Sequence, residues 1–525
     1  MDKITYASLG SLGDEFHREF DTALNHARHR LGAVHPMIIG GKGRKAGAGT
    51  FADLNPANVT QVIGHFQRGS RADVARAVEV ARRAYPDWRE LGWQQRVAFL
   101  RSAADEIARH QFKYAAWLTL EVGKNRVEAI AEVSEAVDLI LYYCRQMELH
   151  QGFAQAMGGA GSERTRSVLK PYGVWAVVAP FNFPFALAAG MAAGALIAGN
   201  TVVFKPASDT PLAGLGLHEA LHNAGLPVGI FNFVTGAGAE VGGELVANEG
   251  VDGMAFTGSR EVGMDLLARF GTRRPRPCLA EMGGKNPAIV MPTANLDDAT
   301  EGVLRSAFGM GGQKCSACSR LYLHRAIYGP FMEMLVEKTR RLKIGDPTRR
   351  ETFLGPLINE AAVERYRKVM LKTRRDGRVV QGGGRPRDGE LAQGYYVEPA
   401  IVDRLPADSP LFREEYFAPI LAVAEIKSLD EALELANRGD YGLTAGIFTQ
   451  IEREQEEFFA GIEAGVTYAN RRGGATTGAW PGVQSFGGWK CSGSSGKGAL
   501  GPYYVQQFLR EQSQTIIRPP PVAKP

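Results

Sequence analysis

Residues 173–259 alternate short β-branched runs with helical segments, and this pattern limits the fold more than any other feature of the chain. The β-branched runs are residues 174–180, 201–206, 231–236 and 254–259. Strands that recur with helices between them predict a parallel sheet with right-handed crossovers. Ligands of such sheets bind beyond the carboxyl ends of the strands. We therefore expect Lys205, Thr235 and Thr257 at a ligand-binding edge.

A second alternation of the same kind follows. It comprises predicted strands and a helix at residues 286–291, 296–309, 320–324 and 466–470. Upstream, the 3.6-residue periodicity of amphipathic helices marks residues 73–85, 93–110 and 112–147. Residues 185–199 are apolar and rich in Ala and Gly, but they are fewer than the ~20 residues that span a bilayer. We expect a buried helix there.

The length of 525 residues exceeds what one hydrophobic core usually serves, so we expect two or three domains. The boundary between the two alternating regions falls near Gly283 and Gly284. A cleft between domains is a common place for a ligand site, and this boundary lets Glu281 and Cys315 face each other across such a cleft.

Charge and cysteine content exclude several classes of protein. The net charge is +5 and the basic residues are scattered in short groups, which argues against a nucleic-acid-binding surface. A mildly positive surface still favours anionic substrates. Five cysteines, an odd number, indicate no disulfide framework and fit the reducing cytoplasm. Residues 1–16 lack the apolar core of a signal peptide, and residues 518–525 form a Pro-rich tail.

A cysteine follows a glycine-rich turn in FGMGGQKCSACSR (residues 308–320), and a carboxylate lies upstream in AEMGGKNP (residues 280–287). A thiolate at Cys315 can attack a carbonyl carbon, and a carboxylate at Glu281 can draw a proton from water to break the adduct. Cys315 and Cys318 also form a C-x-x-C, so half a zinc site or a redox pair are alternatives. The sequence contains no second C-x-x-C or His pair to complete four ligands, so we favour the nucleophile and expect no metal.

Three further signals each have a structural explanation as well as a functional one. Asn182 follows a predicted strand in APFNFP, where its amide can donate to an oxyanion or cap the next helix. Lys205 ends a strand, while Gly258 and Ser259 precede a helix, and this arrangement suits the binding of ribose and phosphate. Glycine is also common at strand-to-helix turns for steric reasons alone, so each signal by itself is weak. Glu281 can be a surface carboxylate or a base whose pKa is raised by burial.

The ordered set APFNFP, GNTVVFKPAS, FTGSREVG, EMGGKNP, GQKCSA, EEYFAP and FGGWKCSG resembles the aldehyde dehydrogenase superfamily over nearly all of residues 35–515. The resemblance implies an α/β protein with a Rossmann-like cofactor domain, an α/β catalytic domain and a small oligomerisation flap. It also implies Cys315 as nucleophile, Glu281 as general base and Asn182 as oxyanion donor, acting through a thiohemiacetal and a thioester. A carboxylate at the base position disfavours the acyl-CoA-forming branch.

The same resemblance implies a nicotinamide cofactor and the residues that bind it. Lys205 matches the ribose-binding lysine, Ser259 the serine on the pyrophosphate, and Glu415 the carboxylate on the nicotinamide ribose. NAD is expected, but Ser208 stands where NAD-preferring relatives often have Glu, which leaves NADP open. The full set of implied cofactor-binding residues is Phe181, Lys205, Ser208, Gly258, Ser259, Glu415 and Phe417.

Three features resemble the branch that oxidises L-glutamate γ-semialdehyde, the open form of 1-pyrroline-5-carboxylate, in proline catabolism. They are EAVDLILYYCRQM (residues 135–147), the serine directly after the nucleophile, and TTGAWPGVQSFGGWK (residues 476–490). Residues 470–475 and the pair Trp480–Pro481 depart from the pattern of that branch. The resemblance places the α-carboxylate of the substrate on Ser316, Gly478 and Ala479, and it adds Phe183 and Phe486 as substrate-binding residues.

The resemblance also implies a domain plan and a set of partners. The plan is an N-terminal arm (1–34), a cofactor domain (35–150 and 172–282), a catalytic domain (283–488), and an oligomerisation flap and tail (151–171 and 489–525). We expect a small-molecule aldehyde substrate, a homo-oligomer, and no nucleic-acid or membrane partner; association with a proline dehydrogenase is left open. The alternatives are a dehydrogenase for another semialdehyde or for aldehydes in general, and a non-catalytic protein with the family fold.

Overall fold

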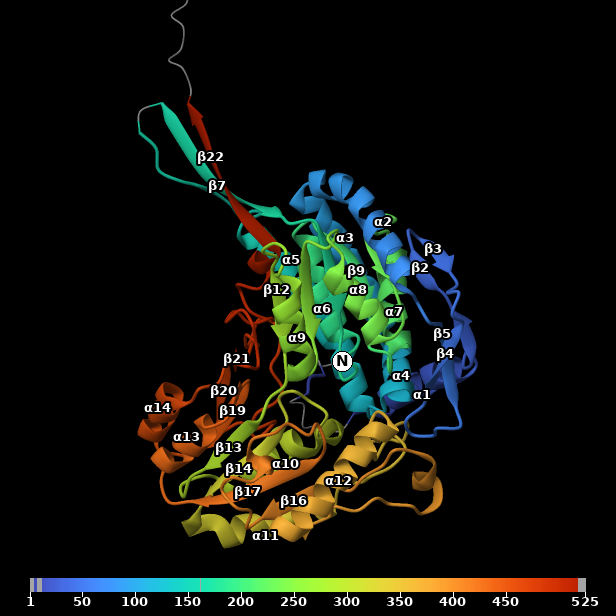
Figure 1. Ribbon diagram of the computed structural model, residues 1–525. Coiled ribbons are helices and arrows are strands. Elements are labelled where there is room, and N and C mark those ends of the chain that lie inside the picture. Colours follow the sequence, from blue (N-terminus) through green and yellow to red (C-terminus); the bar gives the residue numbers. More distant parts are fainter. Residues whose placement is uncertain (1–3, 7–11, 161, 518–525) are drawn as a thin grey trace, which may run out of the picture.

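The computed structural model describes residues 4–6, 12–160 and 162–517, and two seven-stranded sheets form its framework (Figure 1). The expected Pro-rich tail at residues 518–525 and parts of the N-terminal arm lie outside the described residues. The alternating segments of the sequence build the two sheets, so the α/β class is confirmed. In the part of the chain that is described, no helix combines the length and the apolar character needed to cross a bilayer.

The first sheet has the strand order β12–β11–β8–β9–β10–β2–β3, and its first five strands are parallel. The four runs expected as strands are all present. Because the strands are parallel, their carboxyl ends share one edge, where Lys205, Thr257 and Glu281 end their strands. The strands are β2 (Met37–Ile39), β3 (Lys42–Arg44), β8 (Val174–Val178), β9 (Thr201–Lys205), β10 (Phe231–Phe233), β11 (Gly253–Thr257) and β12 (Cys278–Glu281).

Helices cover both faces of the first sheet because its strands are apolar on both faces. In β8, Trp175 and Val177 face one side, and Val174 and Ala176 face the other. The helices on the first side are α1 (Asp14–Arg28), α3 (Trp93–Arg109), α4 (Gln111–Val122), α5 (Arg126–Leu149), α6 (Ala186–Ile197) and α7 (Pro211–Asn223). Those on the second are α2 (Arg71–Glu90), α8 (Gly243–Ala247) and α9 (Arg260–Phe270).

The helical run expected over residues 112–147 is two helices, α4 and α5. Gly123 follows α4 in the left-handed conformation (φ +80°), which ends the helix and favours glycine. A Cβ at Gly123 would also lie 2.7 Å from Pro356. The side chain of Asn125 then caps α5 by accepting from the N–H of Glu128 at 2.9 Å. Apolar periodicity alone does not reveal such a break.

The second sheet has the order β15–β16–β17–β14–β13–β19–β20, and the strands expected in this region are confirmed. Its strands are β13 (Asn286–Val290), β14 (Cys318–His324), β15 (Arg378–Gln381), β16 (Ala400–Asp403), β17 (Ile420–Ile426), β19 (Thr444–Phe448) and β20 (Val466–Ala469). Helices α10 (Leu296–Phe308) and α11 (Tyr328–Arg340) pack on one face. Helices α12 (Glu360–Asp376), α13 (Leu429–Asn437) and α14 (Glu452–Gly461) pack on the other.

A ribbon projects from the body of the molecule (Figure 1). β22 (Leu509–Ile517) pairs along the whole length of β7 (Glu163–Pro171), and β6 (Ala154–Ala156) pairs on the other side of β7. The polar segment after α5 and the end of the chain therefore meet in one sheet. The remaining strands are β1 (Ala33–His35), β4 (Thr50–Leu54), β5 (Val62–Gln67), β18 (Tyr441–Gly442) and β21 (Trp489–Lys490).

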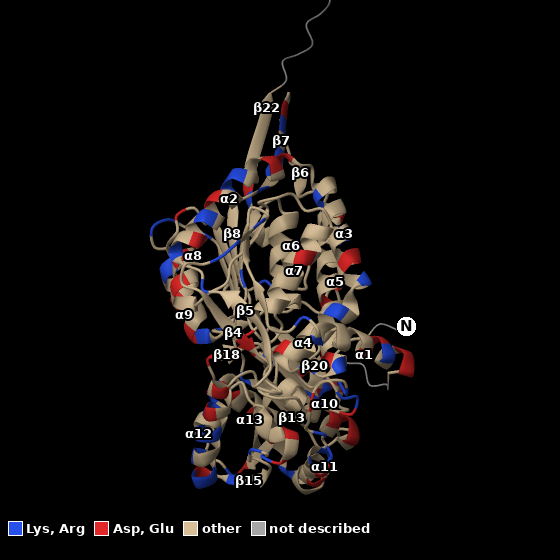
Figure 2. Ribbon diagram, turned by 90° about the vertical axis from the view of Figure 1, so that its right-hand side faces the viewer, with Lys and Arg blue, Asp and Glu red and all other residues tan. Residues whose placement is uncertain are grey.

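Charged residues of both signs lie together on the outer helices in the view of Figure 2. Many of them pair across one turn of a helix, as Glu79 does with Arg83 and Glu337 with Arg341. The scattered basic groups of the sequence thus lie on helix faces and in loops such as residues 272–276, together with acidic partners.

The apolar segment at residues 185–199 forms α6, whose Ala and Gly residues let it lie close to its neighbours. A Cβ at Gly194 would lie 2.6 Å from the ring of Phe508, and a Cβ at Gly190 would lie 3.1 Å from Leu139. Nearly all of the helix is buried. Packing therefore requires Gly194 even though its backbone is helical.

We predict that Gly194→Ala lowers the free energy of unfolding by about 1–3 kcal/mol, because the added methyl group overpacks against Phe508. Gly243→Ala is the matched control, since Gly243 also has helical backbone angles but its Cβ would meet nothing within 4 Å. The control should be neutral or gain up to about 1 kcal/mol. Chemical unfolding of both variants measures the difference, and equal losses would contradict the packing argument.

Candidate active site

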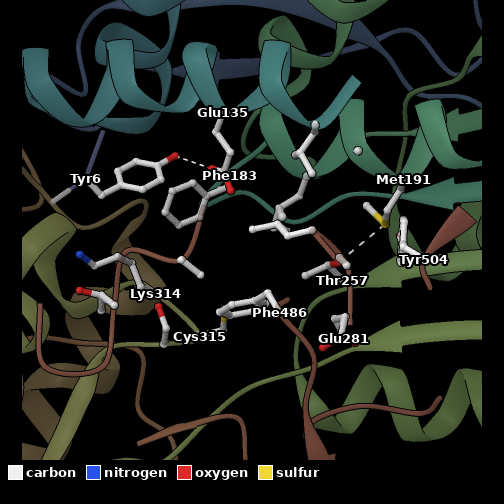
Figure 3. Close-up of a pocket in the computed structure, with 18 of the residues that line it drawn as sticks. Tyr6, Glu135, Phe183, Met191, Thr257, Glu281, Lys314, Cys315, Phe486 and Tyr504 are labelled. Atoms are coloured by element: carbon white, nitrogen blue, oxygen red, sulfur yellow. Dashed lines mark hydrogen bonds between the residues drawn. The ribbon is translucent and has the colours of Figure 1, made fainter. Parts of the chain in front are cut away.

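A buried cavity brings together the nucleophile, base and substrate residues expected from the sequence (Figure 3). Its walls come from α5 and α6, from the ends of β11 and β12, from the loop that carries Cys315, and from the segments before β22. The expected residues in its lining are Cys315, Glu281, Ser316, Gly478, Ala479, Phe183 and Phe486.

Hydrogen bonds to the backbone fix the loop that carries Cys315. The chain leaves α10 through residues 310–312, which all have positive φ. Asn286 Nδ2, in β13, then donates to the carbonyl of Cys315 at 2.7 Å and to that of the residue two positions later at 2.9 Å. Thr476 Oγ1 donates to the carbonyl of Ser316 at 2.7 Å. These bonds hold the loop between β13 and the segment before the expected carboxylate anchor.

The environment of Cys315 favours the neutral thiol. Burial, followed by the charges of Glu415 and Glu281, raises the pKa of the thiol to about 12, while the N–H groups of Ser316 and Cys315 oppose the shift. The thiolate is the nucleophilic form of cysteine. Chemistry at this sulfur therefore needs a group that accepts its proton.

Glu281 ends β12 and lines the same cavity (Figure 3). Burial raises the pKa of its carboxyl to about 8, while the N–H of Gly488, which donates to Oε2 at 3.1 Å, opposes the shift. A carboxylate with such a pKa accepts protons more readily than an exposed one. Its place in the cavity wall argues against the alternative of a surface carboxylate.

The glycine pair between β12 and β13 admits two close contacts. Gly284 N–H donates to Glu415 Oε1 at 2.9 Å, and a Cβ at Gly283 would lie 1.8 Å from Glu415 Oε2. A Cβ at Gly284 would lie 2.4 Å from the carbonyl oxygen of Cys315. Only glycine lets Glu415 and the cysteine loop close on this junction. Burial raises the pKa of Glu415 to about 7, against the opposing effects of the Gly284 N–H and Lys285.

Asn182 lies beside the cysteine loop rather than in the cavity lining. Its Nδ2 donates to the carbonyl of Gln313 at 3.0 Å, and its Oδ1 accepts from the N–H of Phe183 at 3.1 Å. An amide nitrogen has two hydrogens, so one remains for another acceptor. The alternative that Asn182 caps the next helix is wrong, because α6 begins at Ala186 and Glu132 accepts from the N–H groups at its start, at 2.9 and 3.2 Å.

Lys205 is a buried ammonium at the carboxyl edge of the first sheet. Its Nζ donates to the carbonyl of Pro206 at 3.0 Å. Burial lowers the pKa of Lys205 to about 8, and Asp209 opposes the shift. An ammonium has three donors, and one backbone carbonyl leaves the others for a polar ligand.

Ser208, Gly258 and Ser259 follow strands at the same edge. Ser208 Oγ donates to the carbonyl of Gly236 at 3.4 Å. Ser259 caps α9, because its Oγ accepts from the N–H of Val262 at 3.3 Å. The first N–H groups of a helix attract anions, so this end of α9 suits a phosphate.

Phe181 and Phe417 join loops of the two sheets. Phe181 follows β8 and Phe417 precedes β17, and their rings meet edge to face with centroids 5.6 Å apart. Glu415 belongs to the same segment as Phe417. The structure thus brings Phe181, Glu415 and Phe417 to the junction of the two sheets.

An arginine binds the backbone of the loop that is expected to bind the substrate carboxylate. Arg471 Nη1 donates to the carbonyl of Thr477 at 2.9 Å, and Nη2 donates to the carbonyl of Gly478 at 2.5 Å. Gly478 has φ +89°, a conformation that favours glycine. With its carbonyls bound by Arg471, the loop presents Gly478 and Ala479 to the cavity next to Ser316. The segment of residues 470–475, which departs from the branch pattern, therefore supports the anchor.

Cys318 is separate from the cavity. It starts β14 inside the core, where its Sγ lies 3.4 Å from the carbonyl oxygen of Arg320. All five cysteines are free. Over the described ranges, His, Cys, Asp and Glu side chains do not gather in threes as a metal site requires.

Several cavity residues were not predicted from the sequence. Tyr6, Glu135 and Lys314 all line the cavity. Lys314 directly precedes the nucleophile, and Glu135 opens a helical segment noted above, so their positions held a usable signal. Tyr6 held none, because its hydroxyl reaches a partner 129 positions away in the chain.

Comparison with known proteins agrees with this geometry. Residues 44–514 match the model of the aldehyde dehydrogenase family. The chain is 36% identical over 505 residues to 1-pyrroline-5-carboxylate dehydrogenase 1 of Halalkalibacterium halodurans, covering 95% of this chain and 96% of that protein. It is 36% identical over 509 residues to 1-pyrroline-5-carboxylate dehydrogenase of Geobacillus thermodenitrificans, covering 96% of both.

Solved structures give the same result. The structure of 1-pyrroline-5-carboxylate dehydrogenase from Thermus with bound NAD superposes with a TM-score of 0.92 at 35% identity, covering 96% of this chain and 97% of that one. Proline utilization A from Bdellovibrio bacteriovorus superposes with a TM-score of 0.93 at 33% identity, covering 99% of this chain and 54% of that one. The resemblance read from the sequence motifs is thus confirmed, and the chain belongs to the aldehyde dehydrogenase family.

Proposed function

We propose that this chain oxidises L-glutamate γ-semialdehyde, the open form of 1-pyrroline-5-carboxylate, to L-glutamate with NAD, in proline catabolism. The observation that carries the proposal is one cavity lined by Cys315, Glu281, Ser316, Gly478 and Ala479. The names of the relatives, and the NAD bound to one of them, support it.

The first step is addition of the Cys315 sulfur to the aldehyde carbon. Because burial favours the neutral thiol, its proton must leave first, and we assign that proton to a water molecule that carries it to bulk solvent, so that Glu281 stays ionised for the second half of the reaction. As the S–C bond forms, an electron pair moves onto the carbonyl oxygen. The remaining amide hydrogen of Asn182 and the backbone N–H of Cys315 are the donors we assign to that oxygen.

The second half of the reaction releases the product from the sulfur. NAD, when bound, would supply the hydride acceptor needed to oxidise the adduct to a thioester. Glu281 then draws a proton from water, the water oxygen attacks the thioester carbonyl, and the C–S bond breaks to leave a carboxylate and the Cys315 thiol. Phe183 and Phe486 give the cavity apolar walls that limit its water.

The edge of the first sheet fits the adenosine half of a nicotinamide dinucleotide. Among the described residues, the buried Lys205 has one hydrogen-bond acceptor, a backbone carbonyl, so its ammonium would bind ribose oxygens. Gly258, Ser259 and the first N–H groups of α9 would face the pyrophosphate. Ser208 places no negative charge beside the ribose, so NADP is the second cofactor to test.

The junction of the two sheets fits the nicotinamide half. Glu415 is held by the N–H of Gly284 and would bind the hydroxyls of the nicotinamide ribose. Phe181 and Phe417, already in ring contact, would pack beside the nicotinamide.

We extend the proposal to the assembly of the protein. The projecting ribbon of β7 and β22 supports residues 151–171 and 489–525 as the oligomerisation element of a homo-oligomer. The two sheets support a cofactor domain at 35–150 and 172–282 and a catalytic domain at 283–488. Free cysteines support the cytoplasm. The match to part of proline utilization A supports association with a proline dehydrogenase.

Steady-state oxidation of pyrroline-5-carboxylate, succinate semialdehyde and a simple aliphatic aldehyde, each with NAD and NADP, tests the substrate. We predict a kcat/KM for pyrroline-5-carboxylate with NAD at least ~10-fold above that of the aliphatic aldehyde, because hydrogen bonds to a charged group contribute ~1.5–3 kcal/mol. Equal turnover of the aliphatic aldehyde would overturn the specialised substrate. A trace with no reduced cofactor from any aldehyde would favour the non-catalytic alternative.

For Cys315→Ser we predict folded protein with almost no dehydrogenase activity, because a hydroxyl is a far weaker nucleophile at neutral pH. Cys318→Ser is the matched control on the neighbouring core thiol and should keep its activity. Rates and thermal unfolding of both variants are the measurements. If only Cys318→Ser lost activity, the assignment of Cys315 as the nucleophile would be wrong.

For Glu281→Gln we predict a first-turnover burst of reduced cofactor followed by a stall, because the thioester then lacks a base for its hydrolysis. In the unaltered protein, hydrolysis should accelerate as pH rises through about 8, since Glu281 is a base only when ionised. Rapid-mixing kinetics between pH 6 and 9 test both statements, with the pH range chosen to bracket that pKa. A variant without the burst would reassign Glu281 to the earlier steps.

A further inference from the structure

One carboxylate of the cavity has no part in the reaction described above. Glu135, in α5, is 6% exposed and lines the cavity. Its Oε2 accepts a hydrogen bond from the Tyr6 hydroxyl at 2.6 Å. Figure 3 shows Glu135 and Tyr6 on one side of the cavity and Cys315 and Glu281 on the other. Glu135 therefore faces the space that a substrate bound at Cys315 would fill.

The two acidic neighbours of Glu135 on α5 each have a partner. Glu132, one turn earlier, forms a fully buried ion pair with Lys124, whose Nζ lies 2.5 Å from Oε2. Asp138, one turn later, accepts from the indole N–H of Trp480 at 2.5 Å. Within the described residues, no Lys, Arg or His nitrogen comes within 4.0 Å of the Glu135 carboxylate. Among the described residues, Glu135 is therefore not paired with a cation.

A buried carboxylate without a cation is costly. Burial raises the pKa of Glu135 to about 7; the bond from Tyr6 opposes the shift and the charge of Glu132 adds to it. A cation brought by a ligand would remove this cost. The same cavity offers an anion anchor in Ser316, Gly478 and Ala479, so its lining carries recognition for both signs of charge.

We propose that Glu135, oriented by Tyr6, binds the α-ammonium group of the substrate, while Ser316, Gly478 and Ala479 bind its α-carboxylate. An α-amino acid end carries these two charges on one carbon, which suits a cavity that presents both anchors. The inference rests on the proposed function and adds a selection for semialdehydes with an amino group. A semialdehyde that has the carboxylate but no amino group brings no cation to Glu135, whose described partner is then the Tyr6 hydroxyl.

Tyr6 is a positioning residue in this arrangement. Its ring meets Phe183 edge to face, with centroids 5.5 Å apart, and it meets Trp480 in a similar geometry at 5.7 Å. Trp480 directly follows the anchor residue Ala479. The aromatic contacts therefore tie the hydroxyl that holds Glu135 to the loop that holds the carboxylate.

Two substrates of equal length test the proposal on the full-length enzyme. L-Glutamate γ-semialdehyde carries the amino group, and glutarate semialdehyde has the same carbon chain and carboxylate without it. We expect Glu135→Gln to lower kcat/KM for the amino substrate by about 10- to 100-fold, chiefly through KM, and to change that for glutarate semialdehyde little. Tyr6→Phe should give a smaller loss with the same selectivity. Glu148→Gln, an exposed site on α5 paired with Arg101, is the control and should change neither.

Binding of the product gives a readout that does not require turnover. L-Glutamate should inhibit the unaltered enzyme more strongly than glutarate, and Glu135→Gln should remove that preference. Equal losses for both substrates in Glu135→Gln, or equal inhibition by L-glutamate and glutarate in the unaltered enzyme, would overturn the ammonium site. Failure of the proposed function looks different, because the unaltered enzyme would then oxidise simple aldehydes better than either carboxylate-bearing substrate, and both proposals would fall.

Discussion

The close approach of two loops to Gly283 and Gly284 is the constraint on which the rest of the site depends. Side chains at these positions would lie 1.8 Å from the Glu415 carboxylate and 2.4 Å from the Cys315 carbonyl. The cysteine lies in the loop that leads into β14 of the second sheet, whereas the base ends a strand of the first. Without the room left by two missing methyl groups, the sulfur and the carboxylate at position 281 would not share a cavity. The chemistry therefore follows from a packing requirement of the backbone.

Burial changes the charge of the reacting groups in a consistent way. The thiol of Cys315 and the carboxyls of Glu281 and Glu415 shift toward their neutral, protonated forms, and the ammonium of Lys205 shifts toward its neutral form. Each group is thus poised to gain from a ligand that supplies charge or hydrogen bonds. In such a site the reactive groups stay in their neutral forms until substrate occupies the cavity and a cofactor occupies the strand edge.

Patterns within a segment predict much of this protein, and contacts between distant segments account for what they miss. The β-branched runs predict the strands because a doubly covered sheet needs apolar residues on both faces of each strand. Cys315 and Glu281 can be identified in the sequence because each has a reactive side chain and lies next to a glycine-rich turn. In contrast, the break at Gly123 depends on Pro356, and the support of Gly478 depends on how Arg471 folds back. Glu132 caps α6 from another helix, which apolar periodicity cannot reveal.

One face of α5 carries two carboxylates with unrelated duties, separated by less than one turn. Glu132 satisfies the first amides of α6 and is locked to Lys124, whereas Glu135 looks into the space beside the nucleophile. The two carboxylates therefore have separate hydrogen-bond partners, although the charge of Glu132 raises the pKa of Glu135. Substitutions at position 135 are therefore a suitable starting point for laboratory evolution toward new aldehydes. Related proteins can also differ at this position without losing the contacts of Glu132 that hold the helices together.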